Sequence, residues 1–420
     1  MSEILKKDLQ KIFQNLKLTK ENIELRKDNL EKFINSGFPN KSNEEWKFSD
    51  LSQIISSNIK GLKFFDKNLI YKEKIDSIKL DKFADKLSEN NILILVNGYV
   101  SAINFDSEDI KKIQIIDTIE NEPSESKNSL ISLNNAFTSN YLKITVRENY
   151  KFKKPLVILN ISNEKIVSTN INQRLDIVLK KNSELTMINL FHDSSKTNFI
   201  NINHQFKIEE NAILKNYNID YLLNNNIKYI YNNIDLYKNS ISENFLFSNG
   251  SKFLKNDINC NLKEHFSSVF INGLIDIKDS QHHEIKTLVN HLSENTKSHQ
   301  LVKSVLKNNS KGVYQGKIFV AKEAQKTDGY QLSKTLLLDK NTEFDGKPEL
   351  EIYADDVKCS HGSTSGNLDE NSIFYLMSRG ISKDESKKLL VDGFLLDVVN
   401  TITDKYAKNL IKTIMKINEY

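Results

Sequence analysis

The sequence predicts a mainly β protein in which a β-solenoid lies between two helical ends. Three observations predict this fold: apolar residues at helical spacing near both ends, short alternating runs between about residues 150 and 350, and a motif that recurs within those runs. We therefore divide the chain into an N-terminal helical region (residues 1–90), a β core (91–365) and a C-terminal helical region (366–420).

The composition fits a folded protein and narrows the functions open to it. The 420 residues include 59 Lys and Arg against 55 Asp and Glu, which gives a net charge of +4. So small a charge, with no long basic block, argues against nucleic acid as a partner. No stretch has the roughly 18 apolar residues of a membrane span, and the charged start lacks a signal peptide's apolar run. With only Cys260 and Cys359 available, we expect a soluble protein in a reducing compartment.

The N-terminal region predicts helices followed by a turn-rich segment. Apolar residues from Leu5 to Ile34 recur at the 3.6-residue period of amphipathic helices. Gly37 and Pro39 then interrupt the pattern. Trp46, the only tryptophan, follows them, and we expect it to be a buried packing anchor.

The first strand is predicted at Ile92–Val96, a short and continuously apolar run. Asn97-Gly98 follows directly, and this dipeptide favours the type I′ turn of a β-hairpin, in which both central residues have positive φ. Strands are therefore expected to begin near residue 92.

One motif recurs through the middle of the chain: an apolar residue, two mostly charged residues, Asn and a small residue. It occurs at Leu179–Ser183, Ile208–Ala212, Leu236–Ser240, Leu306–Ser310 and Leu338–Thr342, with a degenerate copy at Ile277–Ser280 in the one long gap. A strand-turn unit of about 30 residues cannot bury its apolar face alone, so units must stack into a solenoid. We expect Asn at the corners because it tolerates the left-handed conformation, although an Asn-rich chain could also produce the motif by chance.

The last part of the chain predicts two helices separated by a sharp break. Asp369 or Asn367 can cap the first helix, which should end at Arg379-Gly380. Ser382 and Glu385 then form a capping box for the second. Two roles stay open for this hairpin: a cap over the open end of the solenoid, or a docking surface for a partner.

The densest group of reactive side chains lies in residues 353–362. If this segment is a strand, Asp355, Cys359 and His361 share one face because side chains alternate along a strand. Cys and His both bind iron and zinc, but the alternative is a buried Cys beside a surface His. Because no second Cys lies within ligand spacing, the chain cannot build a four-cysteine iron-sulfur site by itself.

Other catalytic patterns fail. Four histidines lie close together in the sequence, but their spacing fits no known zinc motif, and we expect them on solenoid turns. They are His282, His283, His291 and His299. The segment Gly312–Ile318 has the wrong glycine spacing for a P-loop and lacks its Ser or Thr, so ATP hydrolysis is not expected. The chain also lacks the G-x-S-x-G and G-x-G-x-x-G motifs.

Several segments resemble the SufB/SufD family of iron-sulfur cluster assembly proteins. They are Ile352–Gly366, Phe374-Tyr375-Leu376, Ser378–Ile381, Glu45–Phe48 and parts of His291–Lys317. The likeness covers most of the chain and is weakest at about residues 60 to 150. Cys-Ser-His-Gly and the early Trp-Lys-Phe are typical of the SufD branch, whereas the SufB branch is longer and carries a Glu-containing version of the signature with more cysteines.

The resemblance implies a right-handed parallel β-helix that works as a non-catalytic scaffold. Its partners would be SufB, paired through the last β-helix strands, and two copies of the ATPase SufC. It implies that His361, with Cys359 beside it, supplies part of a site at the SufB interface for a transient nascent cluster or for iron. The C-terminal helices would dock SufC, and the residues expected there are Phe374, Tyr375, Arg379, Gly380 and Phe394.

The resemblance also admits a flavin on the complex, a homodimer of the isolated chain, and a location in the bacterial cytoplasm or in an organelle stroma after loss of a transit peptide. Two other functions stay open at this point. One is a homomeric β-solenoid enzyme, metal-binding or carbohydrate-active, which would need a groove lined by carboxylates. The other is a spacer that only holds SufC at the right distance from SufB.

Overall fold

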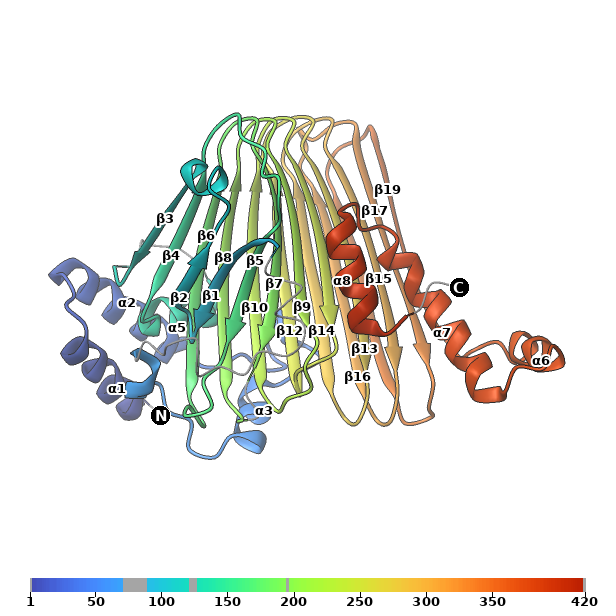
Figure 1. The fold of residues 1–420 in the computed structure, drawn as a ribbon, viewed down its shortest axis with the longest axis horizontal. Coiled ribbons are helices and arrows are strands. Elements are labelled where there is room, and N and C mark those ends of the chain that lie inside the picture. The colour runs from blue at the N-terminus through green and yellow to red at the C-terminus, as the bar shows by residue number, and fades with distance from the viewer. Residues whose placement is uncertain (1, 71–88, 121–126, 194–195, 418–420) are drawn as a thin grey trace.

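The body of the protein is a parallel β-solenoid built from two sheets, one of 10 strands and one of 9 (Figure 1). This computed structural model describes all residues except 1, 71–88, 121–126, 194–195 and 418–420. From β4 to β19 the chain alternates between the sheets, so each pair of consecutive strands forms one coil. The predicted mainly β solenoid with helices at both ends is confirmed.

The 10-stranded sheet has the order β19-β17-β15-β13-β11-β9-β7-β5-β1-β2. Its strands are β1 (Asn91–Val96), β2 (Tyr99–Asn104), β5 (Leu156–Ile161), β7 (Glu184–His192), β9 (Ile213–Asp220), β11 (Ile241–Ser248), β13 (Ser268–Ile277), β15 (Lys297–Leu306), β17 (Thr327–Leu337) and β19 (Val357–Gly366). The 9-stranded sheet consists of β3 (Ile113–Thr118), β4 (Tyr141–Val146), β6 (Asn170–Leu179), β8 (Phe199–Ile208), β10 (Ile227–Leu236), β12 (Phe253–Leu262), β14 (His282–His291), β16 (Lys311–Val320) and β18 (Glu343–Ile352).

The coil length explains the repeat in the sequence. Asn170 on β6 pairs with Phe199 on β8, and Phe199 pairs with Ile227 on β10, so one coil of the solenoid has the same length as one repeat of the motif. Inward-facing apolar side chains of both sheets form one continuous core between them. Each coil is thus buried by its neighbours, as the repeat predicts.

Asn occupies most of the corners because it adopts the left-handed backbone conformation there, as expected. Asn182, Asn211, Asn239 and Asn309 all have positive φ, and so does Ser280 in the degenerate copy. Asn341 is not among the residues with positive φ, so the fifth copy turns in another way. Side-chain amides also join successive corners, because Asn211 donates to Asn182 (2.9 Å) and Asn239 donates to Asn211 (3.0 Å).

The predicted hairpin joins β1 and β2, which pair in antiparallel fashion. Asn97 and Gly98 between them have φ of 53° and 89°. Positive φ at both central residues is what a type I′ turn requires.

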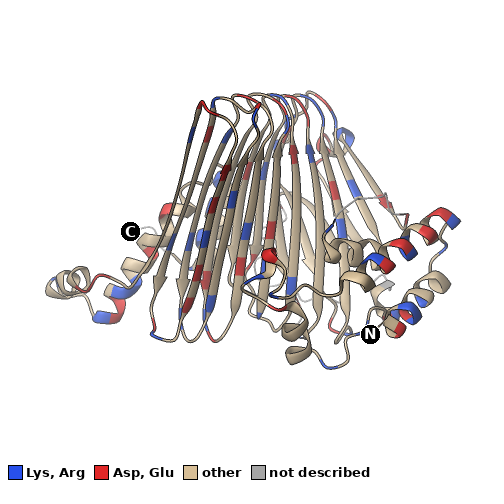
Figure 2. Ribbon diagram, turned by 180° about the vertical axis from the view of Figure 1, so that it is seen from behind, with Lys and Arg blue, Asp and Glu red and all other residues tan. Residues whose placement is uncertain are grey.

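The N-terminal helices pack against the outer face of the 9-stranded sheet (Figure 2). They are α1 (Ser2–Asn15), α2 (Lys20–Ser36) and α3 (Leu51–Asn58), joined in the same cluster by α5 (Ser129–Phe137). The short helices are η1 (Glu44–Trp46), η2 (Lys67–Ile70) and η4 (Asp109–Lys112). Trp46 is buried, packs against Tyr229 with ring centroids 5.6 Å apart and covers the Lys255 ammonium, so the predicted anchor is confirmed.

The C-terminal helices are α6 (Glu370–Ser378), α7 (Lys383–Val399) and α8 (Lys405–Met415). The predicted caps are present: Asp369 caps α6, Gly380 with φ of 87° follows it, and Ser382 and Glu385 form the capping box of α7. α7 and α8 pack on the outer face of the 10-stranded sheet rather than over the end of the solenoid. α6 projects away from both sheets (Figure 1). These helices therefore do not cap the open end of the solenoid.

The division at residues 90 and 365 remains a prediction, and residues 71–88 of its N-terminal region lie outside the described residues.

Candidate functional site

The solenoid ends in two strands that each have one free edge. β19 is the last strand of the 10-stranded sheet and pairs with β17, whereas β18 is the last of the 9-stranded sheet and pairs with β16. Their outer N–H and C=O groups have no ladder partner within the described part of the chain. Such edges are templates for pairing with another strand. β18 also contains Pro348, which has no N–H to donate.

Cys359 and His361 both lie on β19 and face the interior of the solenoid at its open end. In the register with β17, Cys359 is opposite Gly329 and His361 is opposite Gln331, whose side chain is buried between the sheets. The prediction that Cys359 and His361 share a face is confirmed. Asp355 does not join them on the strand, because β19 begins at Val357 and Asp355 lies in the preceding turn.

The environments of these two side chains differ. The Cys359 thiol is half-buried and packs on the small apolar cluster around Ile318, and this burial raises its pKa. Gly329 makes room for it, since a Cβ there would lie 3.2 Å from the sulfur. His361 is exposed. The sulfur is therefore a thiol at neutral pH until a metal or a nearby cation favours the thiolate.

These residues do not complete a metal site within the chain. Nowhere in the described ranges do three or more His, Cys, Asp or Glu side chains gather so that they could hold a metal ion. A thiol and an imidazole on one face of a strand supply two ligands, whereas iron and zinc sites in proteins usually have four. Further ligands would have to come from outside the chain.

α6 exposes a group of large apolar side chains. Phe374 is 73% exposed, Tyr375 58% and Met377 43%, on a helix that leaves the body of the protein. Arg379 caps its C-terminus and lies over the Tyr375 ring, at 5.3 Å from the centroid. Exposed large apolar side chains grouped on one helix make α6 a candidate surface for protein interaction.

Phe394, also expected at the docking surface, lies elsewhere. It is on α7 and packs against the apolar cluster of the 10-stranded sheet. The buried Lys303 ammonium lies 4.3 Å from its ring centroid, donates to its carbonyl oxygen and pairs with Asp397 at 2.7 Å. Phe394 therefore attaches α7 to the protein's own sheet, and α6 carries the exposed aromatic residues.

The four histidines lie on strands rather than on turns, so that expectation was wrong. His282, His283 and His291 belong to β14 and His299 to β15. His283 and His291 are buried, with hydrogen bonds to Ser251 O and to two hydroxyl groups respectively. The histidines do not form a common site, because strand alternation and two different sheets separate them.

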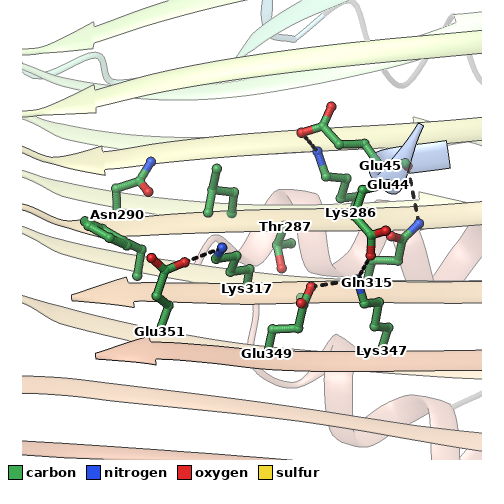
Figure 3. Close-up of a pocket in the computed structure, with 13 residues that line it drawn as sticks. Glu44, Glu45, Lys286, Thr287, Asn290, Gln315, Lys317, Lys347, Glu349 and Glu351 are labelled. Atoms are coloured by element: carbon green, nitrogen blue, oxygen red, sulfur yellow. Dashed lines mark hydrogen bonds and ion pairs between the residues drawn. The ribbon is translucent and has the colours of Figure 1, made fainter. Parts of the chain in front are cut away.

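A groove of about 460 Å³ crosses the outer face of the 9-stranded sheet beside η1 (Figure 3). Its floor comes from β14, β16 and β18, where Lys286, Gln315 and Lys347 are in register. Sequence reasoning missed this groove, although each of these three residues is separated from the next by one coil. Aligning the sequence repeats with one another would have placed these three residues at the same position of successive coils.

Each carboxylate in the groove pairs with a lysine (Figure 3). Glu45 pairs with Lys286 at 2.7 Å, Glu351 with Lys317 at 2.5 Å, and Glu44 and Glu349 with Lys347. The lysine hydrogen bonds lower the pKa of Glu44 and of Glu351. A glycosidase needs a general acid with a raised pKa, so these carboxylates do not favour the carbohydrate-active alternative. The contacts instead attach η1 to the last strand of the sheet.

Charges of both signs alternate over this face, without a basic stripe (Figure 2). Within the described residues, no helix is long and apolar enough to span a lipid bilayer.

The fold and the site define a β-solenoid whose last two strands have free edges, with a thiol and an imidazole on one face at that end and an exposed aromatic helix beside it. The chain belongs to the SufBD family of iron-sulfur cluster assembly proteins. The family model for the SufBD core domain of the SUF system matches residues 160–394, more than half of the chain.

Curated relatives cover nearly the whole length. The chain is 25% identical over 389 residues to the iron-sulfur cluster assembly protein SufD of Escherichia coli, covering 91% of this chain and 89% of the relative. It is 22% identical to a SufBD family protein of Synechocystis, covering 87% and 84%. It is 23% identical to the chloroplastic protein ABCI7 of Arabidopsis thaliana, covering 93% and 86%.

Proposed function

We propose that this chain is the SufD-type scaffold subunit of a SUF complex. It pairs with SufB through β18 and β19, docks the ATPase SufC through α6, and supplies Cys359 and His361 to a site for a nascent iron-sulfur cluster or iron that is completed by SufB. The subunit itself is not an enzyme. The observation that carries the proposal is that Cys359 and His361 lie at the C-terminal end of the solenoid, where β18 and β19 each have a free edge.

The free edges support the pairing with SufB. Two edge strands of 10 residues each offer main-chain groups on both sheets, so that a partner with matching edges could continue both sheets at once. A ligand set divided between two chains would then be completed by assembly. Because the chain contributes only a thiol and an imidazole, the cluster would be held weakly enough to be passed on.

The exposed aromatic residues of α6 support the docking of SufC. Phe374 and Tyr375 present a hydrophobic surface on a helix that the protein's own core does not need. Aromatic and Arg side chains are the groups that contribute most to protein interfaces. In an assembly driven by ATP, this helix would transmit movement of the ATPase to the solenoid through α7.

The relatives include bacterial proteins and a chloroplastic one, so we propose the bacterial cytoplasm or an organelle stroma as the compartment.

The test is anaerobic co-expression with the cognate SufB and SufC, followed by iron and sulfide analysis of the purified complex. His361→Ala should leave the complex intact and lower its iron content several-fold, because one ligand of the shared site is lost. Ser360→Ala is the matched control: it changes the neighbouring residue of β19, whose side chain points to the opposite face. Control and wild type should hold equal iron.

Phe374→Ala with Tyr375→Ala should abolish the retention of SufC while SufB remains bound. An intact complex with unchanged iron in His361→Ala would contradict the cluster role and favour the spacer function. Failure of the wild type to bind either partner would contradict the proposal as a whole.

A further inference from the structure

The interior of the solenoid changes from apolar to polar toward its open end. On β13 the inward positions are Ile271, Gly273 and Ile275, which belong to or border the apolar core. The same positions are Gln300, Val302 and Ser304 on β15, Gln331, Ser333 and Thr335 on β17, and His361, Ser363 and Ser365 on β19. His361 is therefore the outermost member of a row that begins with two buried glutamines.

The carboxamide nitrogen of Gln331 has a hydrogen-bond partner, whereas its oxygen has none among the described residues. The side chain is 0% exposed, and its Nε2 donates to the Gly316 carbonyl oxygen at 3.2 Å across the solenoid. Gly316 is required there, because a Cβ at that position would overlap the carboxamide. Oε1 of Gln331 is buried and accepts no hydrogen bond from the described residues. An unpaired buried acceptor destabilises the fold, so we looked for a donor that could reach it.

His361 is the neighbour that can supply the missing donor. Gln331 and His361 are direct register partners on adjacent parallel strands, whose backbones lie about 4.8 Å apart, so their side chains are neighbours on the same inner face. His361 has no hydrogen bond to any described residue, so its ring can rotate. A histidine that binds metal through one ring nitrogen almost always donates the N–H of the other to a carbonyl or carboxylate oxygen.

We propose that Gln331 is the positioning residue of His361: its Oε1 accepts the inner ring N–H and leaves the outer ring nitrogen unprotonated, directed to the open end of the solenoid. The Gly316 carbonyl orients the carboxamide, the carboxamide sets the imidazole tautomer, and the imidazole presents one lone pair to a metal ion. This inference rests on the proposed role of His361 in a shared metal site, but the tautomer it predicts exists in the free chain.

The first test uses the isolated full chain with ¹⁵N-labelled histidine. NMR of the His361 ring nitrogens should show one dominant tautomer in the wild type and exchange between two tautomers in Gln331→Met, which fills the same space without an acceptor. Gln331→Glu keeps an acceptor oxygen and should restore a single orientation of the ring. Gln300→Met is the matched control, because it changes the same row one coil deeper, where His361 cannot reach.

The second test measures iron in the co-expressed complex. Gln331→Met should lower it by about tenfold at limiting iron, with partial recovery in Gln331→Glu, because loss of such a partner weakens metal binding about 10- to 100-fold. Unchanged ring nitrogens in Gln331→Met, or an equal change in Gln300→Met, would overturn the inference whatever the iron content. A fixed tautomer in the wild type together with no loss of iron in His361→Ala would contradict the proposed function instead.

Discussion

Three buried histidines show how single residues link this fold to pH. His204 contacts the Asn232 amide oxygen at 3.1 Å, His283 contacts the Ser251 carbonyl oxygen at 2.7 Å, and His291 lies between the hydroxyls of Thr296 and Ser298. Burial lowers the pKa of His204 and of His283 to about 4 and that of His291 to about 3, from the ordinary 6.5. All three are therefore neutral in the folded protein at neutral pH.

We predict that the free energy of unfolding falls as the pH decreases from about 6.5 toward 4. In this range the unfolded chain takes up protons on these histidines and the folded chain does not, so acid favours unfolding. Each histidine contributes on the order of 1–3 kcal/mol over the whole range. Urea denaturation at pH 7.5 and pH 5.5, followed by circular dichroism, measures the change.

His204→Gln should make this pH dependence shallower, because it removes one of the titrating groups. Equal pH dependence in wild type and His204→Gln would show that other groups cause it.

At the scale of the element, the corners decide how one coil follows the next. Asn211 has a φ of 58° and its amide is joined to the corners before and after it. Asn thus contributes twice: it adopts the left-handed conformation at low cost, and its side chain continues the stack from coil to coil. Asn341 has the same motif around it, but its φ is not positive. It therefore does not form the left-handed corner that Asn211 forms.

We predict that Asn211→Ala lowers the free energy of unfolding by about 1–2 kcal/mol, because alanine lacks the polar side chain whose hydrogen bonds allow Asn to adopt the left-handed conformation at low cost. Asn211→Gly should cost less, because glycine adopts this conformation freely and loses only the amide hydrogen bonds. Asn341→Ala is the matched control and should have almost no effect. Thermal and urea denaturation check the order, and an equal loss in the Gly and Ala variants would show that backbone conformation is not the reason.

For the whole molecule, the helices cover the outer faces of the sheets and leave the β18–β19 end of the solenoid open. The N-terminal helices cover the outer face of the 9-stranded sheet, and α7 and α8 cover the outer face of the 10-stranded sheet. The strands β18 and β19 keep free edges, and η1 holds β18 through Glu44 and Lys347. The last strands are therefore held in place while their outer edges remain free to pair with a partner.

We predict that a proline at a suitable position of β19 abolishes the binding of SufB without lowering the stability of the chain. Consecutive residues of a parallel strand direct their N–H groups to opposite sides, so of Ser363→Pro and Thr364→Pro one removes an N–H from the free edge and the other breaks a bond to β17. The edge variant should keep its melting temperature and lose SufB in co-purification. The other should melt lower. Retention of SufB by a stable edge variant would show that the partner does not pair with β19.

Much of the fold follows from the sequence because it depends on local patterns. The recurring corner motif, the Asn-Gly turn and the capping box at Ser382 all act within a few residues, and all three are present. The spacing of apolar residues also predicted the helices in the N-terminal and C-terminal regions. The positions of α7 and α8 were not, because an amphipathic pattern gives the face that is buried but not the surface that buries it.

The sequence by itself determined that this protein is a solenoid of the SufBD family with Cys359 and His361 on one face of a strand, because coil length, corner chemistry and side-chain alternation are local properties. Only the tertiary structure decided that this face is the interior at an open end, that Phe394 is attached to the protein's own sheet while Phe374 is exposed, and that Gln331 lies beside His361. Those relations join residues one coil or more apart in the sequence, and only the stacking of whole coils brings them together.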